Sequence, residues 1–110
     1  MLTKSPCGIL LKLIYILEKK HRKPIDGKEL LNMINTLQNE NPTIYIYNIQ
    51  KSNNNEQEEL ISFDFWDDLS ILKNSGRIII NKSDPKIDIT VTGSLSAETL
   101  EIPQNIEENF

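Results

Sequence analysis

Residues 62–93 constrain the fold of this 110-residue chain more than any other stretch. Ser62 is a suitable N-cap for a helix, and Gly76 suits the left-handed position that follows a helix. Between them, apolar side chains recur at the spacing of one buried helical face: Phe65, Leu69 and Leu72, with Trp66 at the edge. The pattern predicts a helix that ends at residues 74–76.

Two strands around a polar turn are predicted directly after that helix. Residues 77–80 and 87–92 are rich in β-branched side chains, and the polar turn occupies residues 81–86. In the second strand, apolar side chains alternate with polar ones: Ile87, Ile89 and Val91. This alternation predicts a β-hairpin with one buried side and one side in water.

Residues 9–21 are predicted as a helix with more apolar surface than one core-facing stripe requires. One arc is sufficient for a domain core: Leu10, Leu13, Ile14 and Leu17. Leu11 and Tyr15 fall on a different side, which leaves two interpretations open. Either the helix is covered on two sides by its own chain, or Leu11 and Tyr15 form a homodimer interface with a second copy.

A second helix has the clearest start signal in the chain. Asp26 is a good N-cap, and Glu29 stands three residues later, as in a capping box. The predicted core stripe of this helix is Leu30, Met33, Ile34 and Leu37. Residues 43–50 are then predicted as a strand, which pairs across the polar loop 51–57 with a shorter extended piece at 58–61.

The C-terminal part carries weaker signals. Residues 94–102 are predicted as a short helix or a strap that uses Leu95, Leu100 and Ile102. Residues 103–110 are predicted as a flexible acidic tail. The chain is therefore predicted to be one α+β domain spanning residues 1–102, with three helices, a C-terminal β-hairpin and an inserted hairpin between the second and third helices.

The sequence predicts a cytoplasmic protein with no membrane contact. Its apolar run at residues 9–17 is interrupted by Lys12 and is shorter than the roughly 20 residues that a membrane span needs. Basic residues follow the run where a secretory signal would have a cleavage site. Cys7 is the single cysteine of the sequence, so no internal disulfide forms, as is usual in a reducing compartment.

Catalytic chemistry finds little support in the sequence. His21 lies in a basic run and is interpreted as part of a solvated helix end, and Cys7 has no recognisable histidine–acid partners. Acidic residues near the start of the predicted third helix are interpreted as favourable partners of the helix dipole rather than as a divalent-ion site: Asp64, Asp67 and Asp68. We therefore expect no enzyme, no cofactor and no metal.

Two segments resemble the winged-helix superfamily, at the end of its third helix and in its wing strands. They are Asp68-Leu69-Ser70-Ile71-Leu72-Lys73-Asn74-Ser75-Gly76-Arg77-Ile78 and Ile89-Thr90-Val91-Thr92-Gly93. With the first two helices, the resemblance covers residues 9–93, and the chain is similar to small archaeal or archaeal-virus DNA-binding regulators. One departure is the connection at residues 39–61, because a helix-turn-helix joins these helices by a turn of a few residues. The insertion either keeps the helices in the usual relation or separates them.

The resemblance implies DNA binding, in which the third helix enters the major groove and the wing contacts the backbone. The three aspartates of the third helix would face phosphates unfavourably, so the predicted nucleic-acid contacts lie at its end and on the hairpin: Lys73, Asn74, Arg77, Lys82 and Lys86. Lys82 and Lys86 are equally well explained as solvated wing-tip residues. The basic run at residues 19–23, with Lys28, either contacts the DNA backbone from the side or keeps a helix end soluble.

Charge is distributed unevenly along the chain, whose net charge is −4. Residues 1–51 hold eight lysines and arginines against four acids, and residues 52–110 hold four against twelve. We expect a small transcriptional regulator that binds double-stranded DNA as a homodimer. The alternative is a protein–protein interaction module without nucleic-acid binding, which would use the acidic third helix or the strand with Tyr45 and Tyr47.

Overall fold

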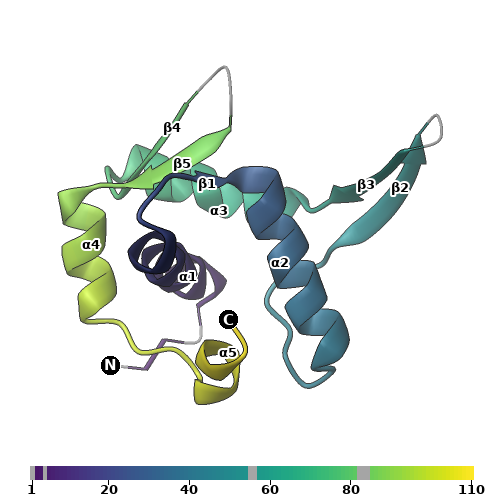
Figure 1. The fold of residues 1–110 in the computed structure, drawn as a ribbon, viewed down its shortest axis with the longest axis horizontal. Coiled ribbons are helices and arrows are strands. Elements are labelled where there is room, and N and C mark those ends of the chain that lie inside the picture. Colours follow the sequence, from purple (N-terminus) through teal and green to yellow (C-terminus); the bar gives the residue numbers. More distant parts are fainter. Residues whose placement is uncertain (1, 4, 55–56, 82–84) are drawn as a thin grey trace.

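The computed structural model describes residues 2–3, 5–54, 57–81 and 85–110, and they form an α+β fold as predicted (Figure 1). The elements in chain order are α1 (Pro6–His21), β1 (Ile25–Asp26), α2 (Gly27–Glu40), β2 (Gln50–Asn54), β3 (Gln57–Ile61), α3 (Phe63–Asn74), β4 (Ile78–Ile80), β5 (Lys86–Ile89), α4 (Val91–Glu98) and α5 (Gln104–Glu108). The described residues thus contain five helices, two more than the three predicted. None of these helices is both long and apolar enough to cross a membrane.

Helix α1 lies near the centre of the molecule, with α4, the sheet, α2 and α5 around it (Figure 1). It packs against α3, α4 and β5. The predicted core arc of α1 is confirmed, because Leu10, Leu13 and Ile14 have no exposed surface. Leu11 is also only 2% exposed, so the protein's own chain covers the surplus apolar side of the helix at this position.

Strands β1, β5 and β4 form a three-stranded antiparallel sheet in that order. The predicted hairpin is confirmed, with Ile78 opposite Ile89 and Ile80 opposite Ile87. β1 joins the other side of β5, where Ile25 lies opposite Ile87. The sheet therefore fastens the hairpin to the connection between α1 and α2.

The second strand of the hairpin ends earlier than the predicted residue 92. Thr90 is instead the N-cap of α4, because its hydroxyl accepts a hydrogen bond from Gly93 N at 3.0 Å and donates one to Gly76 O at 2.7 Å. Val91 was predicted to be buried, and this prediction is wrong: it begins α4 and is 79% exposed. The hydrogen bonds of the Thr90 side chain start a helix at this point, although the alternating apolar pattern favoured a longer strand.

Helix α2 begins as predicted, with Asp26 Oδ1 accepting hydrogen bonds from Lys28 N at 2.8 Å and Glu29 N at 3.3 Å. Its core stripe differs from the prediction at one position. Met33 is 37% exposed, whereas Leu31 is 3% exposed. The buried face of α2 therefore consists of Leu30, Leu31, Ile34 and Leu37.

The strand predicted at residues 43–50 is wrong for residues 43–49, which adopt irregular structure. Gln38 on α2 takes the place of a strand partner. Its Oε1 accepts hydrogen bonds from Ile46 N at 2.7 Å and Tyr47 N at 2.8 Å, and its Nε2 donates to Tyr47 O at 3.0 Å. Because the side chain satisfies three backbone groups, this apolar segment packs into the core without a ladder.

Strands β2 and β3 form the inserted hairpin, which projects away from the other elements at the upper right of Figure 1. Most of the polar segment predicted as a loop at 51–57 is strand, so the hairpin begins later in the chain than predicted and extends further into this segment. Helix α3 then begins as predicted, because Ser62 Oγ accepts a hydrogen bond from Phe65 N at 3.4 Å. It also ends as predicted, with Gly76 at a φ of 77°.

The C-terminal segment is more ordered than the flexible tail predicted at 103–110. Residues 104–108 form α5, and Ile106 is 5% exposed and belongs to the hydrophobic core. Phe110 packs against that core. In α4, by contrast, Leu95 is 60% exposed, so the prediction that it packs against the core is wrong. Burial of Ile106 provides a physical reason for the order of this segment.

Candidate nucleic-acid interface

The structure divides the predicted nucleic-acid contacts instead of gathering them. Lys73 and Asn74 are exposed at the end of α3, Lys86 is exposed at the start of β5, and Lys82 lies outside the described residues. Thr90 N donates to Arg77 O, and Asn81 N donates to Lys86 O, so Arg77 and Lys86 lie at opposite ends of the hairpin. At about 3.3 Å per residue, the two positions are roughly 13 Å apart along the strands.

Arg77 is less available than the sequence predicted, because it is half-buried at the base of the hairpin. It lines a cavity of about 360 Å³ between α1, α3 and α4, together with Cys7, Leu11 and Leu100. Burial is the main factor that raises the pKa of the Cys7 thiol, and Asp68 raises it further. A raised pKa leaves a smaller fraction of this thiol as the nucleophilic thiolate.

The three aspartates of α3 are not equivalent. Asp64 and Asp67 are exposed, but Asp68 is half-buried and accepts a hydrogen bond from the Tyr47 hydroxyl at 2.7 Å. The exposed side of α3 also carries two large apolar side chains, since Phe63 is 80% exposed and Ile71 is 55% exposed. No phosphate-binding cation lies on the first two turns of this helix.

Tyr45 and Tyr47 do not form the predicted aromatic strand for a protein partner. Tyr45 is 75% exposed, whereas Tyr47 is 2% exposed and contributes to the core. Their segment is irregular, so an extended binding edge is missing there. The strand predicted to carry this surface is therefore wrong for residues 43–49, while binding of a protein partner there stays a prediction.

The structure instead brings a second group of basic residues beside the hairpin. We define the basic junction as residues 19–28, which run from the last residues of α1 through β1 to the first residues of α2. The junction exposes five cations: Lys19, Lys20, Arg22, Lys23 and Lys28. Within the junction, Asp26 of β1 lies opposite Lys86 of β5 in the strand register, and Gly27 N donates a hydrogen bond to Pro85 O at 2.9 Å. Segments about sixty positions apart in the sequence thus lie side by side.

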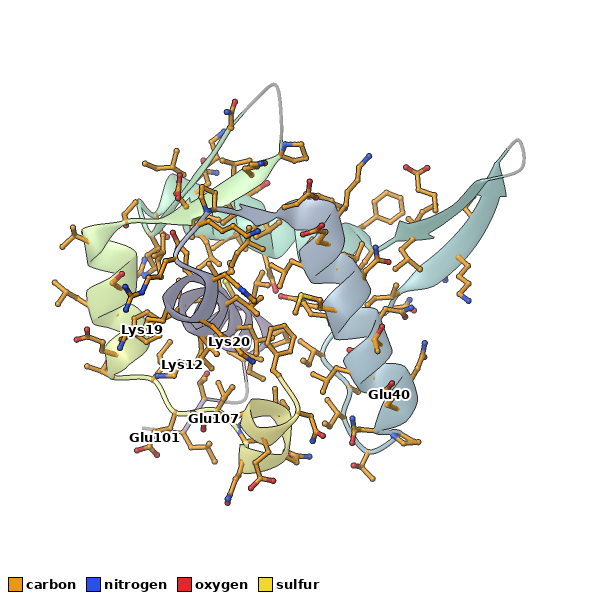
Figure 2. The ribbon with its side chains drawn as sticks, in the orientation of Figure 1. Lys12, Lys19, Lys20, Glu40, Glu101 and Glu107 are labelled. Carbon is orange, nitrogen blue, oxygen red and sulfur yellow. The ribbon has the colours of Figure 1, made fainter. Side chains whose placement is uncertain are left out.

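The local charge of this region is opposite to that of the whole chain. Residues 18–28 and 86–88 hold six lysines and arginines against three acids. One of these acids, Asp26, is occupied as the N-cap of α2. Figure 2 shows Lys12, Lys19 and Lys20 along α1, with Glu40 at the far end of α2. The sequence revealed the basic run itself, but its position beside the hairpin depends on the pairing of β1 with β5.

The turn of the basic junction has a specific backbone conformation. Arg22 adopts a left-handed φ of 56° after the last turn of α1, and its N–H donates to Glu18 O at 2.6 Å. This conformation is uncommon for a residue other than glycine. It directs the chain out of α1 and, through Pro24, into β1.

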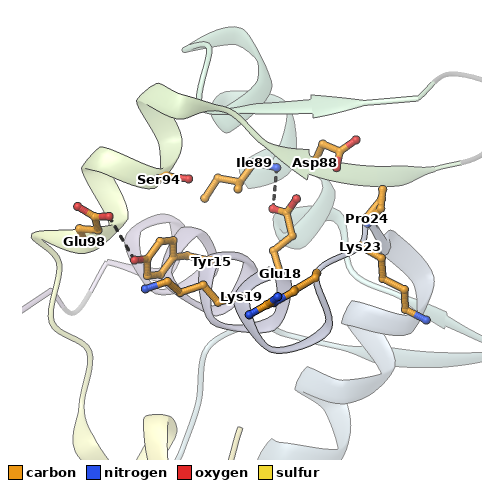
Figure 3. A pocket seen from close by; sticks show the side chains of 10 residues that line it. Tyr15, Glu18, Lys19, Lys23, Pro24, Asp88, Ile89, Ser94 and Glu98 are labelled. Atoms are coloured by element: carbon orange, nitrogen blue, oxygen red, sulfur yellow. Dashed lines mark hydrogen bonds between the residues drawn. The ribbon is translucent and has the colours of Figure 1, made fainter.

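A cavity of about 450 Å³ is lined by residues from the end of α1, from β5 and from α4 (Figure 3). Lys19, Arg22 and Lys23 line it on the side of the basic junction, and three acidic residues also belong to its lining: Glu18, Asp88 and Glu98. Glu18 Oε2 accepts a hydrogen bond from Ile89 N at 2.8 Å. Burial is the main factor that raises the pKa of Glu18, the Ile89 N–H lowers it, and the neighbouring Asp88 raises it.

Tyr15 lies at the edge of the same cavity and is partly buried by charged side chains. Its hydroxyl donates to Glu98 Oε1 at 3.4 Å, and the Nζ atoms of Lys12 and Lys19 lie 5.2 and 4.9 Å from its ring centroid. Lys12 also donates to Ala97 O at 2.9 Å, which ties α1 to the end of α4. With Leu11 buried, the homodimer interface predicted at Leu11 and Tyr15 lacks one of its two residues, and homodimer formation stays a prediction.

The described residues contain no group of three or more histidine, cysteine, aspartate or glutamate side chains that could hold a metal ion. Comparison of the chain with models of known protein families, with curated proteins and with solved structures finds no match. The function must therefore be argued from the charges and geometry of the chain itself.

Proposed function

We propose that this protein is a small winged-helix-like transcriptional regulator that binds double-stranded DNA. In this proposal the basic junction and the start of β5 contact the phosphate backbone. The observation that carries the proposal is the pairing of β1 with β5, which sets Asp26 opposite Lys86 and so joins the basic junction, with its five exposed cations, to the strand that begins at Lys86. A cluster of this kind attracts a polyanion even though the chain as a whole is acidic.

The order of the elements supports the winged-helix part of the proposal. Helices α1, α2 and α3 precede the hairpin of β4 and β5, and the sheet order β1-β5-β4 attaches that hairpin to the first two helices. The inserted hairpin of β2 and β3 leaves room for this arrangement by projecting outward (Figure 1).

Contacts to phosphates suit this surface better than reading of bases by α3. Base contacts commonly come from the N-terminal part of a recognition helix, where α3 carries the exposed Asp64 and Asp67. These carboxylates would face phosphates at an energetic cost. The proposed contact is therefore largely independent of DNA sequence and strongly dependent on salt.

A salt titration with a mixed-sequence DNA duplex tests the proposal. Fluorescence anisotropy of a labelled duplex would be measured for the wild type, for the triple variant Lys20→Ala/Lys23→Ala/Lys28→Ala, and for Lys73→Ala/Asn74→Ala. The triple variant should bind more weakly at every salt concentration. Its log–log salt slope should become shallower by about 0.9 for each lysine–phosphate pair that the substitutions remove.

The two variants also separate the basic junction from the end of α3. A loss of affinity confined to Lys73→Ala/Asn74→Ala would move the contact to α3 and contradict the role of the junction. Absence of wild-type binding even at low salt would reject DNA as the partner.

A second candidate function, a protein-interaction module, is favoured by the exposed side of α3. Phe63 and Ile71 are two helical turns apart with Asp67 between them, and both apolar side chains are largely exposed. Large exposed apolar residues of this kind often mark protein-binding surfaces. This candidate predicts that Phe63→Ser/Ile71→Ser abolishes association with a protein partner, while DNA affinity is absent in both the variant and the wild type.

A further inference from the structure

The backbone amide of Ile89 lacks a partner strand. Thr90 N donates to Arg77 O across the hairpin, so the preceding N–H, that of Ile89, points toward the opposite side of β5, where β1 lies. β1 is too short to reach it, because its pairs are Ile25 with Ile87 and Asp26 with Lys86. Lys23 would stand opposite Ile89 in a longer strand, but Pro24 and the turn at the end of α1 stop the strand before that position.

The Glu18 side chain supplies the missing acceptor. Its Oε2 lies 2.8 Å from Ile89 N, and Figure 3 shows this side chain extending from α1 to the strand. The backbone oxygen of the same residue accepts the hydrogen bond from Arg22 N at 2.6 Å. Glu18 therefore forms hydrogen bonds both to the turn at Arg22 within the basic junction and to the strand that carries Lys86.

We propose that Glu18 is a positioning residue that holds the basic junction against strand β5, so that the cations of both segments face one polyanion together. The inference rests on the proposed DNA binding and assigns a role within that surface. Glu18 would not itself contact DNA, because a carboxylate repels phosphates. Its contribution is the hydrogen bond to Ile89, which no other described residue makes.

An ionised carboxylate at position 18 costs folding free energy, because other acidic side chains lie near it. Asp88 on β5 and Glu98 on α4 line the same cavity, and Lys19, Arg22 and Lys23 line its other side. The negative charge also weakens attraction of phosphates to the junction. The negative charge of Glu18 therefore weakens DNA binding, whereas its hydrogen bond to Ile89 N supports it. Substitutions that remove one and keep the other can distinguish these two effects.

Two substitutions at position 18 separate the hydrogen bond from the charge. Glu18→Gln and Glu18→Ala both remove the negative charge, but only Glu18→Gln keeps an oxygen that accepts from Ile89 N. Two readouts would be measured in each variant of the full chain: amide hydrogen exchange at Ile89 by NMR, and affinity for a mixed-sequence duplex. Exchange at Ile34, in the core face of α2, serves as the reference for overall stability.

We expect Glu18→Gln to keep Ile89 protected and to bind DNA as tightly as the wild type or more tightly. We expect Glu18→Ala to speed exchange at Ile89 at least tenfold relative to Ile34 and to bind at least threefold more weakly than Glu18→Gln. Asp88→Asn, which removes a neighbouring charge and leaves the hydrogen bond in place, should behave like Glu18→Gln in both measurements.

Equal DNA affinity of the Gln and Ala variants would overturn the positioning role, and equal protection of Ile89 in both would overturn the hydrogen bond itself. If no form of the protein binds DNA, the proposed function fails, and with it the role in DNA binding. Exchange at Ile89 still decides separately whether Glu18 holds the junction to β5.

Discussion

The hydroxyl of Tyr47 donates a hydrogen bond to Asp68 Oδ2 at 2.7 Å and thereby ties the irregular segment 43–49 to helix α3. The Tyr47 ring also meets Phe65 edge-on, with centroids 5.7 Å apart. Burial is the main factor that raises the pKa of Tyr47, and Asp68 raises it further. Tyr47 therefore holds the irregular segment against α3 and forms a hydrogen bond with one of the three aspartates of that helix.

Replacing Tyr47 by phenylalanine should lower the free energy of unfolding by about 1–3 kcal/mol, because Asp68 would lose the hydrogen bond that partly compensates its burial. Tyr45→Phe is the matched control, since Tyr45 is 75% exposed, and its effect should be within about 0.5 kcal/mol. Urea unfolding followed by circular dichroism would measure both. Equal effects of the two substitutions would contradict the structural role of the Tyr47 hydroxyl.

Gln38→Ala should destabilise the protein by about 2–4 kcal/mol, because it leaves the backbone groups of Ile46 and Tyr47 without their partner. Gln38→Glu keeps the accepting oxygen and loses the donor to Tyr47 O, so its destabilisation should be smaller. Denaturant midpoints of the two variants give the comparison. Asn39→Ala, at an exposed neighbouring position, should change little, and a similar destabilisation there would contradict the specific role of the Gln38 side chain.

Gly27→Ala should destabilise the protein although alanine favours helices. A Cβ at this position would lie 3.0 Å from Trp66 Cη2 and 3.3 Å from Pro85 O, where α2, α3 and the hairpin meet. We expect a decrease of about 1–2 kcal/mol in the free energy of unfolding and a shift in the fluorescence of Trp66, the single tryptophan of the chain. Gly8→Ala is the control, because the atoms nearest to a Cβ at this position belong to the Thr3 side chain, which can rotate away. The Trp66 fluorescence of this variant should not change.

Leu11→Ala should lower the free energy of unfolding by about 2–5 kcal/mol, as expected for a buried leucine. The decrease should be independent of protein concentration, because the protein's own chain covers this side chain. Thermal unfolding at several concentrations would measure it. A decrease that shrinks on dilution would instead support the homodimer interface at this residue, because association stabilises the wild type less at low concentration.

The Glu18 carboxyl should make stability fall as the pH rises. Its pKa is raised in the folded protein, mainly by burial, so the folded state binds a proton more tightly than the unfolded state. Stability therefore decreases as pH increases from the ordinary glutamate range, about 4.5, toward neutrality. The difference in unfolding free energy between Glu18→Gln and the wild type should grow in favour of the variant from about pH 4.5 to about pH 7. A constant difference over this range would contradict the raised pKa.

Helix caps and the hairpin were predictable because their signals are local. Asp26 and Ser62 cap their helices through atoms two or three residues away, and Gly76 takes a conformation that glycine favours. The strand predicted at 43–50 failed for the opposite reason. Its β-branched and aromatic side chains indicate burial, but the backbone partner that decides strand or irregular structure is Gln38, on another element.

In the candidate site, too, local features could be predicted from the sequence and contacts between distant segments could not. The basic run at residues 19–23 is visible in the sequence, and so are the acids of α3 that make base reading unfavourable. The position of that run near strand β5 could not be read from the sequence, because the two-residue strand β1 is too short to carry a pattern. The separation of Arg77 from Lys86 likewise depends on the hairpin register.

Within residues 62–93, the amino-acid sequence by itself determined that a capped helix ends at a glycine and leads into a hairpin, because these features need only neighbouring residues. Tertiary structure alone decided that Asp68 accepts a hydrogen bond from Tyr47, and that β1 and Glu18 lie along the other side of β5. Each of these contacts satisfies a polar group with a partner distant in the sequence. Local propensity cannot rank such alternatives, since their free energies are set by packing of the whole chain.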